Sequence, residues 1–184
     1  MWRGCLRSGG GVGRNLASWL TEPGSLTARC QAHSRAFQVR LLHLGYGRPL
    51  ADEQAGRAKR LVREVLLECD GIPVIFAHTT LSTAAGGQLS RWLACLGSRS
   101  LGSLLFAHPG FIRGRIEYCR LDARHPLFQR VVGLIHPVKY LWARRSWHHL
   151  GAQAVLVTEV FLPAIEQLAG GREDALAIQQ RKCR

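Results

Sequence analysis

A tight turn between two long apolar runs constrains the fold of this chain more than any other feature of its sequence. Asp70-Gly71 separates residues 61–68 from residues 72–81, and both runs are rich in Val, Ile, Leu and other strand-forming residues. Asp and Gly tolerate the positive φ angles that a two-residue turn between antiparallel strands requires. The sequence therefore predicts a β-hairpin whose side chains alternate between two faces.

Further strands and several short helices are predicted on either side of this hairpin. Alternating patterns predict strands at 36–46, 112–121, 138–148 and 154–162. Helical patterns and capping residues predict short helices at 15–22, 25–30, 82–96 and 101–106. Residues 123–137, which contain Pro126 and Pro137, are expected to be irregular. Because the strands come mostly in neighbouring pairs with the helices grouped between them, we expect an α+β fold. It would have a single antiparallel β-sheet, with helices covering one face.

Length and composition are those of one domain. The chain has 184 residues, of which 47% are apolar and 20% charged, so a sizeable core can form. We expect residues 15–166 to form this domain and residues 167–184 to form a basic tail. The Gly- and Arg-rich residues 1–14 are expected to be disordered. Their arginines, with no acidic residue before Glu22, also faintly resemble a mitochondrial transit peptide.

The formal net charge of +13 indicates an affinity for anions but does not choose among them. Nucleic acid, membrane surfaces and acidic metabolites would all be attracted. The sequence has no RNP, KH or zinc motif, so we expect no nucleic-acid partner. The longest stretch without charge, residues 71–90, is interrupted by Pro, His, Thr, Gly and Gln, so we expect no stable membrane insertion.

The cysteines suggest a reducing compartment. None form a C-x-x-C pair, and they lie inside helical or strand patterns, which favours free, mostly buried thiols over disulfides or zinc. We therefore expect a cytoplasmic protein. The six residues are Cys5, Cys30, Cys69, Cys95, Cys119 and Cys183.

Two charged residues interrupt strand faces that are otherwise apolar. Arg63 shares its face of the 61–67 segment only with Leu and Val, and Glu159 shares its face of the 155–161 segment with Val and Phe. A buried charge needs a partner or a wetted cavity. By contrast, Glu64 and Glu68 fall on the opposite face of their strand and are expected to face solvent.

Two interpretations of this pair are open. Arg63 and Glu159 could pair with each other or with other polar groups of the core. Alternatively, they could line a closed pocket on the covered face of the sheet. Arg63 would then bind a carboxylate with its planar fork, and Glu159 would take or share a proton.

His78 is a third candidate for the pocket. It follows Ile72, Val74 and Phe76 on one face of its strand, where a lone histidine is more often a satisfied core residue than a catalyst. No phosphate-binding loop, nucleophile elbow or metalloprotease motif is present, so no metal site is expected. One face of the 138–148 strand could form a nucleic-acid stacking platform, although such residues are commonly only edge or cover residues: Tyr140, Trp142 and Arg144.

Several of these segments together resemble the chorismate lyase family, the chorismate–pyruvate lyases of ubiquinone biosynthesis. The resemblance spans about residues 16 to 165. It is carried by residues 61–79 (LVREVLLECDGIPVIFAHT), 100–106 (SLGSLLF) and 156–164 (LVTEVFLPA), and more weakly by 17–29. It implies an antiparallel sheet with a buried ligand pocket under helical lids. It also implies conversion of chorismate to 4-hydroxybenzoate and pyruvate without metal or cofactor, and we expect a monomer.

The resemblance also implies roles for individual residues. Arg63 would bind a carboxylate of the substrate and Glu159 would be the acid, so the family pattern selects the same two charges as the strand faces. Leu101 would contribute a backbone contact, and Leu26, where the family usually has Met, would contact the ligand from a lid. His78 stands where an arginine is expected, in reach of the second carboxylate.

Two other classes of function remain open. The effector-sensing domains of some bacterial transcription regulators resemble this fold and bind small acids without catalysis. They normally follow a DNA-binding domain, for which the short segment before residue 15 leaves no room. The basic charge alone suggests the other alternative, a nucleic-acid-binding protein.

Overall fold

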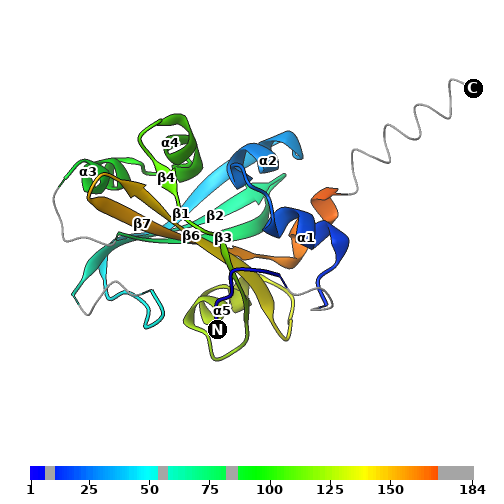
Figure 1. Cartoon of the computed structure of the whole chain (residues 1–184). Helices are drawn as coiled ribbons and strands as arrows, with labels where there is room; N and C mark the ends of the chain where they lie inside the picture. Colours follow the sequence, from blue (N-terminus) through cyan, green and yellow to red (C-terminus); the bar gives the residue numbers. More distant parts are fainter. Residues whose placement is uncertain (7–10, 54–57, 82–86, 170–184) are drawn as a thin grey trace, which may run out of the picture.

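A computed structural model describes residues 1–6, 11–53, 58–81 and 87–169. Its centre is one antiparallel sheet, in which the strands lie side by side in the order β1-β2-β3-β7-β6-β4, with β5 also paired to β6 (Figure 1). The strands are β1 (Phe37–Gly47), β2 (Arg60–Cys69), β3 (Ile72–Leu81), β4 (Ile112–Arg113), β5 (Glu117–Leu121), β6 (Leu141–Leu150) and β7 (Gln153–Phe161). The predicted α+β class with a single antiparallel sheet is confirmed.

The predicted hairpin joins β2 to β3. Asp70 and Gly71 have φ angles of 52° and 80°, the positive values that a two-residue turn needs. The Asp70 carboxylate also accepts hydrogen bonds from the backbone N–H groups of Arg35 and Ala36, at 2.9 and 2.8 Å. The turn is thereby tied to the beginning of β1, so three consecutive strands are held in register at one end of the sheet.

Short helices cover both faces of the sheet. The helical segments are α1 (Arg14–Leu20), α2 (Leu26–Ala32), α3 (Gln88–Cys95), α4 (Leu101–Ala107), α5 (Pro126–Val131), η1 (Val132–Leu134) and η2 (Pro163–Ala169). Helices α2, α3 and α4 lie over one face, which we call the lid face (Figure 1). Helix α5 packs on the other face, so the helical cover is more extensive than predicted. No helix within the described ranges is both long and apolar enough to cross a membrane.

The helix α5 lies where the sequence predicted irregular structure. Pro126 occupies the first turn of this helix, and the His125 side chain accepts a hydrogen bond from the Leu127 N–H at 3.2 Å. Proline is well tolerated there because the first N–H groups of a helix have no intrahelical partner. The proline that suggested a break therefore begins a helix instead. The expected helix cap at Ser82 lies outside the described residues.

The N-terminal segment is partly ordered against the sheet, contrary to the prediction of disorder over residues 1–14. Arg3 and Tyr118 exchange two backbone hydrogen bonds of 2.9 and 2.7 Å. Trp2 also donates a hydrogen bond to the carboxylate of Asp52. These contacts attach residues 1–6 to β5, the strand that flanks β6. Most of the predicted basic tail, from residue 170, lies outside the described residues.

The face opposite the lids is buried rather than solvated. Leu66 and Phe76 on this face pack with Phe128 of α5 in one apolar cluster. Glu68, expected to face solvent, is only 4% exposed and receives a hydrogen bond from Arg40 at 2.7 Å. The alternation of β2 was predicted correctly, but both of its faces are covered.

Candidate functional site

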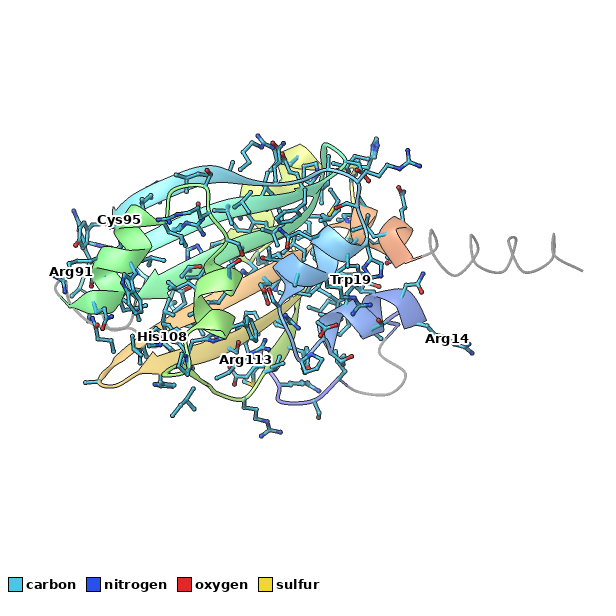
Figure 2. All side chains as sticks on the ribbon, turned by 90° about the horizontal axis from the view of Figure 1, so that it is seen from above. Arg14, Trp19, Arg91, Cys95, His108 and Arg113 are labelled. Atoms are coloured by element: carbon cyan, nitrogen blue, oxygen red, sulfur yellow. The ribbon has the colours of Figure 1, made fainter. Side chains whose placement is uncertain are left out.

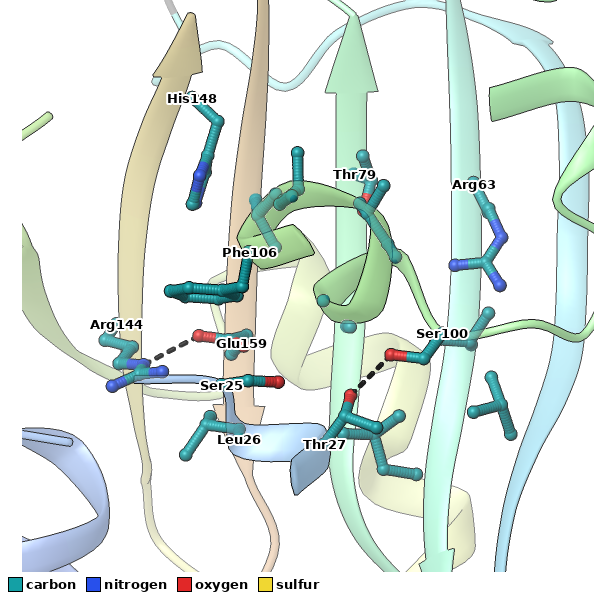
Figure 3. Close-up of a pocket in the computed structure, with 18 of the residues that line it drawn as sticks. Ser25, Leu26, Thr27, Arg63, Thr79, Ser100, Phe106, Arg144, His148 and Glu159 are labelled. Atoms are coloured by element: carbon teal, nitrogen blue, oxygen red, sulfur yellow. Dashed lines mark hydrogen bonds and ion pairs between the residues drawn. The ribbon is translucent and has the colours of Figure 1, made fainter. Parts of the chain in front are cut away.

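A pocket with a cavity volume of about 50 Å³ lies between the lid face of the sheet and the helices α2 and α4. Figure 3 labels residues of β2, β3, β6, β7, α2 and α4 around it. Its polar lining consists of Ser25, Thr27, Arg63, Thr79, Ser100, Arg113, Arg144, His148 and Glu159. The expected site residues Arg63, Glu159, Leu26 and Leu101 all line this pocket.

Arg63 is buried on β2 and is held by backbone carbonyls alone. Its Nη2 donates to the carbonyl oxygens of Gly97 and Arg99 at 2.8 and 2.7 Å. No carboxylate of the described chain lies within ion-pair distance of its guanidinium. Burial lowers the pKa of Arg63 to about 10, so it remains a cation at neutral pH. This guanidinium is a fixed positive charge without a counterion of its own.

Glu159 pairs with Arg144, a residue that the sequence considered only as part of a stacking platform. The two residues face each other across β7 and β6, and Arg144 Nε donates to Glu159 Oε2 at 2.6 Å. Arg144 is 1% exposed and also donates to the backbone carbonyls of Leu20 and Glu22, at 3.3 and 2.6 Å. Arg63 and Glu159 therefore do not pair with each other; each binds other polar groups of the core, Glu159 the Arg144 side chain and Arg63 two backbone carbonyls, as the first interpretation allowed.

The lid consists of two helices whose first residues meet above the pocket. Ser25 caps α2 and Ser100 caps α4, and in each helix the next residue, Leu26 or Leu101, lines the pocket. The Ser100 hydroxyl donates to the Thr27 hydroxyl at 2.7 Å, which links the two helices (Figure 3). The sequence predicted both helices, and their caps place the lid residues as expected.

Gly102 allows these two helices to approach closely. A Cβ atom at this position would lie 2.8 Å from the Ser25 hydroxyl oxygen, closer than side chains tolerate. Gly102, in the S-L-G segment, therefore permits the close contact between α2 and α4 that covers the pocket.

His148 and Arg113 form the end of the pocket that lies farthest from Arg63 in the strand order. They face each other across β6 and β4. The His148 ring is 3.2 Å from the Ser146 hydroxyl, and Arg113 Nε donates to the same hydroxyl at 3.1 Å. Burial, with smaller contributions from Arg113 and Arg144, lowers the pKa of His148 to about 4, so this ring is neutral at pH 7. Neither residue was predicted to belong to the site.

His78 does not reach the pocket, although the sequence made it a candidate. It lies on the opposite face, 2.7 Å from Glu64 and 3.0 Å from Glu53. The reason is a β-bulge beside Pro73, which shifts the β2–β3 register by one residue. Without the bulge, the two-residue turn would place His78 opposite Arg63; with it, Thr79 takes that place. A shift of one residue moves a side chain to the other face of a sheet.

The pocket as a whole is positively charged. Three arginines and one glutamate line it, and with His148 neutral they leave two positive charges without a counterion. In the part of the chain that the structure describes, no group of His, Cys, Asp or Glu side chains is placed to hold a metal ion. This arrangement can bind a small organic anion through its guanidinium groups, while the Glu159 carboxylate, fixed by Arg144, can accept a hydrogen bond from a ligand hydroxyl.

The fold and the pocket define a small α+β protein with a positively charged pocket under a helical lid. A model of the family described as chorismate lyase matches residues 11–169. A probable chorismate pyruvate-lyase of Dechloromonas aromatica is 67% identical over 157 residues, which cover 83% of this chain and 89% of that protein. Another, of Methylobacillus flagellatus, is 46% identical over 161 residues, which cover 84% of this chain and 90% of that protein. The chain belongs to the chorismate lyase family.

Solved structures with similar folds are more distant. A GntR-family transcriptional regulator of Bacillus cereus aligns with a TM-score of 0.49 at 12% sequence identity. The alignment covers 69% of this chain and 92% of that chain.

Proposed function

We propose that this protein is a chorismate lyase that converts chorismate to 4-hydroxybenzoate and pyruvate. The observation that carries the proposal is the pocket under the lid, where Arg63 is buried without a counterion and Glu159 is oriented by Arg144. Chorismate is a dianion, and the pocket leaves two positive charges uncompensated. Membership of the chorismate lyase family supports the same reaction.

The residues at the Arg63 end suit the ring carboxylate. Its guanidinium lies against the 97–99 backbone, directly before α4. The backbone N–H of Leu101 belongs to the first turn of α4, where N–H groups lack intrahelical partners and can donate to an anion. We assign the ring carboxylate to Arg63 and to the Leu101 backbone, with Leu26 packing on the ligand from α2.

Glu159 suits the part of the substrate where the reaction occurs. In this reaction the ether bond between the ring and the enolpyruvyl group breaks. The proton on the neighbouring, hydroxyl-bearing ring carbon leaves, and the ring becomes aromatic. Arg144 holds one oxygen of Glu159 at 2.6 Å, so the carboxylate has a fixed direction. We assign to Glu159 the hydrogen bond from the ring hydroxyl and a share in moving this proton.

The lid supplies the remaining requirement, exclusion of water. Aromatisation provides the driving force, so the protein has to hold both carboxylates, orient the ring and keep the site closed. The linked N-termini of α2 and α4 close the pocket above Glu159. None of these tasks requires a metal or a cofactor, and we propose none.

Incubation of the purified protein with chorismate tests the proposal directly. We expect the ultraviolet absorbance of 4-hydroxybenzoate to grow with time, together with equimolar pyruvate measured by a coupled assay. Turnover should persist after exhaustive chelation. Tight binding of 4-hydroxybenzoate without any turnover would instead make the protein a sensor of small acids and overturn the proposed reaction.

The cellular setting is part of the same proposal. The product would enter ubiquinone biosynthesis as its first aromatic intermediate, and we propose that the protein acts in the cytoplasm as a monomer. The thiols of Cys30 and Cys69 are buried and not joined by a disulfide, which supports a reducing compartment. Size-exclusion chromatography with light scattering would test the monomer; a dimer at micromolar concentration would contradict it.

A further inference from the structure

The roles of Arg63 and Glu159 leave one anionic group of the substrate without a partner. We propose that Arg113, supported by His148 and Ser146, binds the carboxylate of the enolpyruvyl group. This subsite rests on the proposed lyase function, because only that reaction requires a second carboxylate next to the ring. It would make Arg113 a determinant of substrate binding that is separate from recognition of the aromatic product.

The first argument is the way in which Arg113 is held. Its Nε donates to the Ser146 hydroxyl at 3.1 Å, and its Nη1 donates to the Pro23 carbonyl at 2.7 Å. The guanidinium also lies over the Phe106 ring of α4, at 5.6 Å from the ring centre. Figure 2 labels Arg113 beside this helix. Two neutral acceptors and a ring therefore fix its direction. They leave the Nη2 group without a hydrogen-bond acceptor among the described residues.

The second argument is charge. The two carboxylates nearest to Arg113 are already engaged, since Glu159 binds Arg144 at 2.6 Å and Glu22 binds Arg29 at 3.3 Å. Burial and the neighbouring charge of Arg144 lower the pKa of Arg113. A ligand carboxylate at this position would relieve both effects. The neutral His148 ring adds a polar group without adding a negative charge that would repel the ligand.

The third argument is position. Arg63 lies on β2 and Arg113 on β4, with β3, β7 and β6 between them. Four strand spacings place the two backbones roughly 19 Å apart, and both side chains extend into the pocket from opposite sides. Two extended arginine side chains leave space for one compact ligand with an anionic group at each end. In Figure 3, Arg63 and His148 lie on opposite sides of the pocket, with Glu159 between them across the sheet.

The test compares two ligands that differ by one carboxylate. The first is 4-hydroxybenzoate, and the second is 3-(carboxymethoxy)-4-hydroxybenzoate, an unreactive aromatic compound with an ether carboxylate beside the hydroxyl. We expect Arg113→Gln to weaken the second ligand roughly 10- to 100-fold in calorimetry. Affinity for 4-hydroxybenzoate should stay within about twofold. Arg113→Lys should recover only part of the loss, because an ammonium lacks the planar fork.

Arg115→Gln is the matched control. Arg115 lies two residues away, is exposed, and bonds to the Gly4 carbonyl outside the pocket. It removes the same net charge, so a general effect of charge would appear in both variants. An equal loss for both ligands in Arg113→Gln, or no loss for either, would overturn the subsite. A thermal melt of each variant separates loss of binding from loss of folding.

Failure of the subsite and failure of the proposed reaction give different results in these experiments. If the wild-type protein binds both ligands and Arg113→Gln discriminates between them, the subsite stands even when chorismate is not turned over. If the wild-type protein turns over chorismate and Arg113→Gln raises KM less than about twofold, the reaction stands and the subsite fails.

Discussion

On the face of the sheet opposite the lids, basic side chains lie against carboxylates. His78 lies between Glu64 and Glu53, at 2.7 and 3.0 Å, and Arg130 also contacts Glu64. A second group on this face joins Arg145 to Glu117 at 2.7 Å and to Asp52 at 3.6 Å. Hydrogen bonds from His125 and Trp2 hold the pKa of Asp52 well below its usual value.

On the lid face, the arginines outnumber the carboxylates. Among the described residues that line the pocket, Arg144 has a carboxylate partner, Glu159, whereas carbonyl and hydroxyl oxygens hold Arg63 and Arg113. Burying a charge costs free energy that an ion pair can offset, and neutral dipoles offset it only in part. A buried cation that only carbonyl and hydroxyl oxygens hold indicates a binding site for an anion. A buried cation that is paired with carboxylates indicates a structural role. The predictions below test this comparison.

The largest effect is expected from neutralising one carboxylate on each face. Glu159→Gln should lower turnover of chorismate on the order of 10²- to 10⁴-fold, because the amide cannot carry a proton. The carbonyls of Leu20 and Glu22 still bind Arg144 in this variant, so its thermal melt should remain cooperative. Glu117→Gln removes the matching ion pair on the other face and should leave turnover within about twofold. Intact turnover in Glu159→Gln would remove this residue from the mechanism.

A pH titration of stability should reveal the neutral histidine of the lid face. The pKa of His148 is about 4 in the folded protein, below its ordinary value near 6.5. Between these two pH values the unfolded chain binds a proton that the folded chain does not, so stability falls as the pH falls. The loss attributable to His148 should reach about 3 kcal/mol at most near pH 4.

His148→Gln identifies this contribution. Urea unfolding at pH 7 and pH 4.5 should show a smaller loss of stability in this variant than in the wild-type protein. An equal loss in the two proteins would mean that His148 is protonated in the folded state, which would contradict the electrostatics described for the pocket.

Removal of Arg63, a buried cation that only backbone carbonyls hold, should weaken ligand binding. Arg63→Ala should lower the affinity for 4-hydroxybenzoate by roughly 1.5–3 kcal/mol, because a charge-assisted hydrogen bond to a carboxylate is lost. Arg63→Lys should restore this affinity only in part. Arg145→Ala, on the opposite face, should lower the melting temperature and leave the affinity of the folded protein unchanged. Calorimetry and thermal melts on these variants measure the two effects. Lower affinity in folded Arg145→Ala, together with normal affinity in Arg63→Ala, would contradict the comparison.

The smallest effect is expected from the link between the lid helices. Thr27→Val keeps the shape of the side chain but removes the acceptor of the Ser100 hydroxyl, a bond worth about 1 kcal/mol. Stopped-flow measurements should show 4-hydroxybenzoate leaving roughly fivefold faster. Ser34→Ala removes a hydrogen bond just beyond the other end of α2, to the Cys30 carbonyl, and should leave the release rate unchanged. Equal rates in all three proteins would show that this link does not control release.

The features that local sequence could predict are those set by neighbouring residues. The Asp70-Gly71 turn, the Ser25 cap of α2, and the anomalous charges at Arg63 and Glu159 all depend on a few consecutive positions. The structure places each of them where the sequence predicted. Their roles in binding and catalysis remain proposals.

The features that were missed depend on pairing between distant strands. Arg144 faces Glu159 only because β6 and β7 pair in a particular register. Arg113 lies on β4, the first two residues of the predicted 112–121 strand, which the structure divides into β4 and β5, and its place opposite His148 depends on pairing with β6. His78 was assigned to the wrong neighbours because a bulge beside Pro73 reverses which face of β3 accompanies Arg63. Alternation reveals that a strand has two faces, but not which of them a helix will cover.

The backbone carbonyls that hold Arg63 also affect the entropy of ligand binding. A long, flexible arginine loses about 2 kcal/mol of rotamer freedom when it is ordered. Gly97 and Arg99 impose this loss when the chain folds, before any ligand arrives. An incoming carboxylate therefore meets a guanidinium whose orientation is already restricted, and little further ordering opposes its binding.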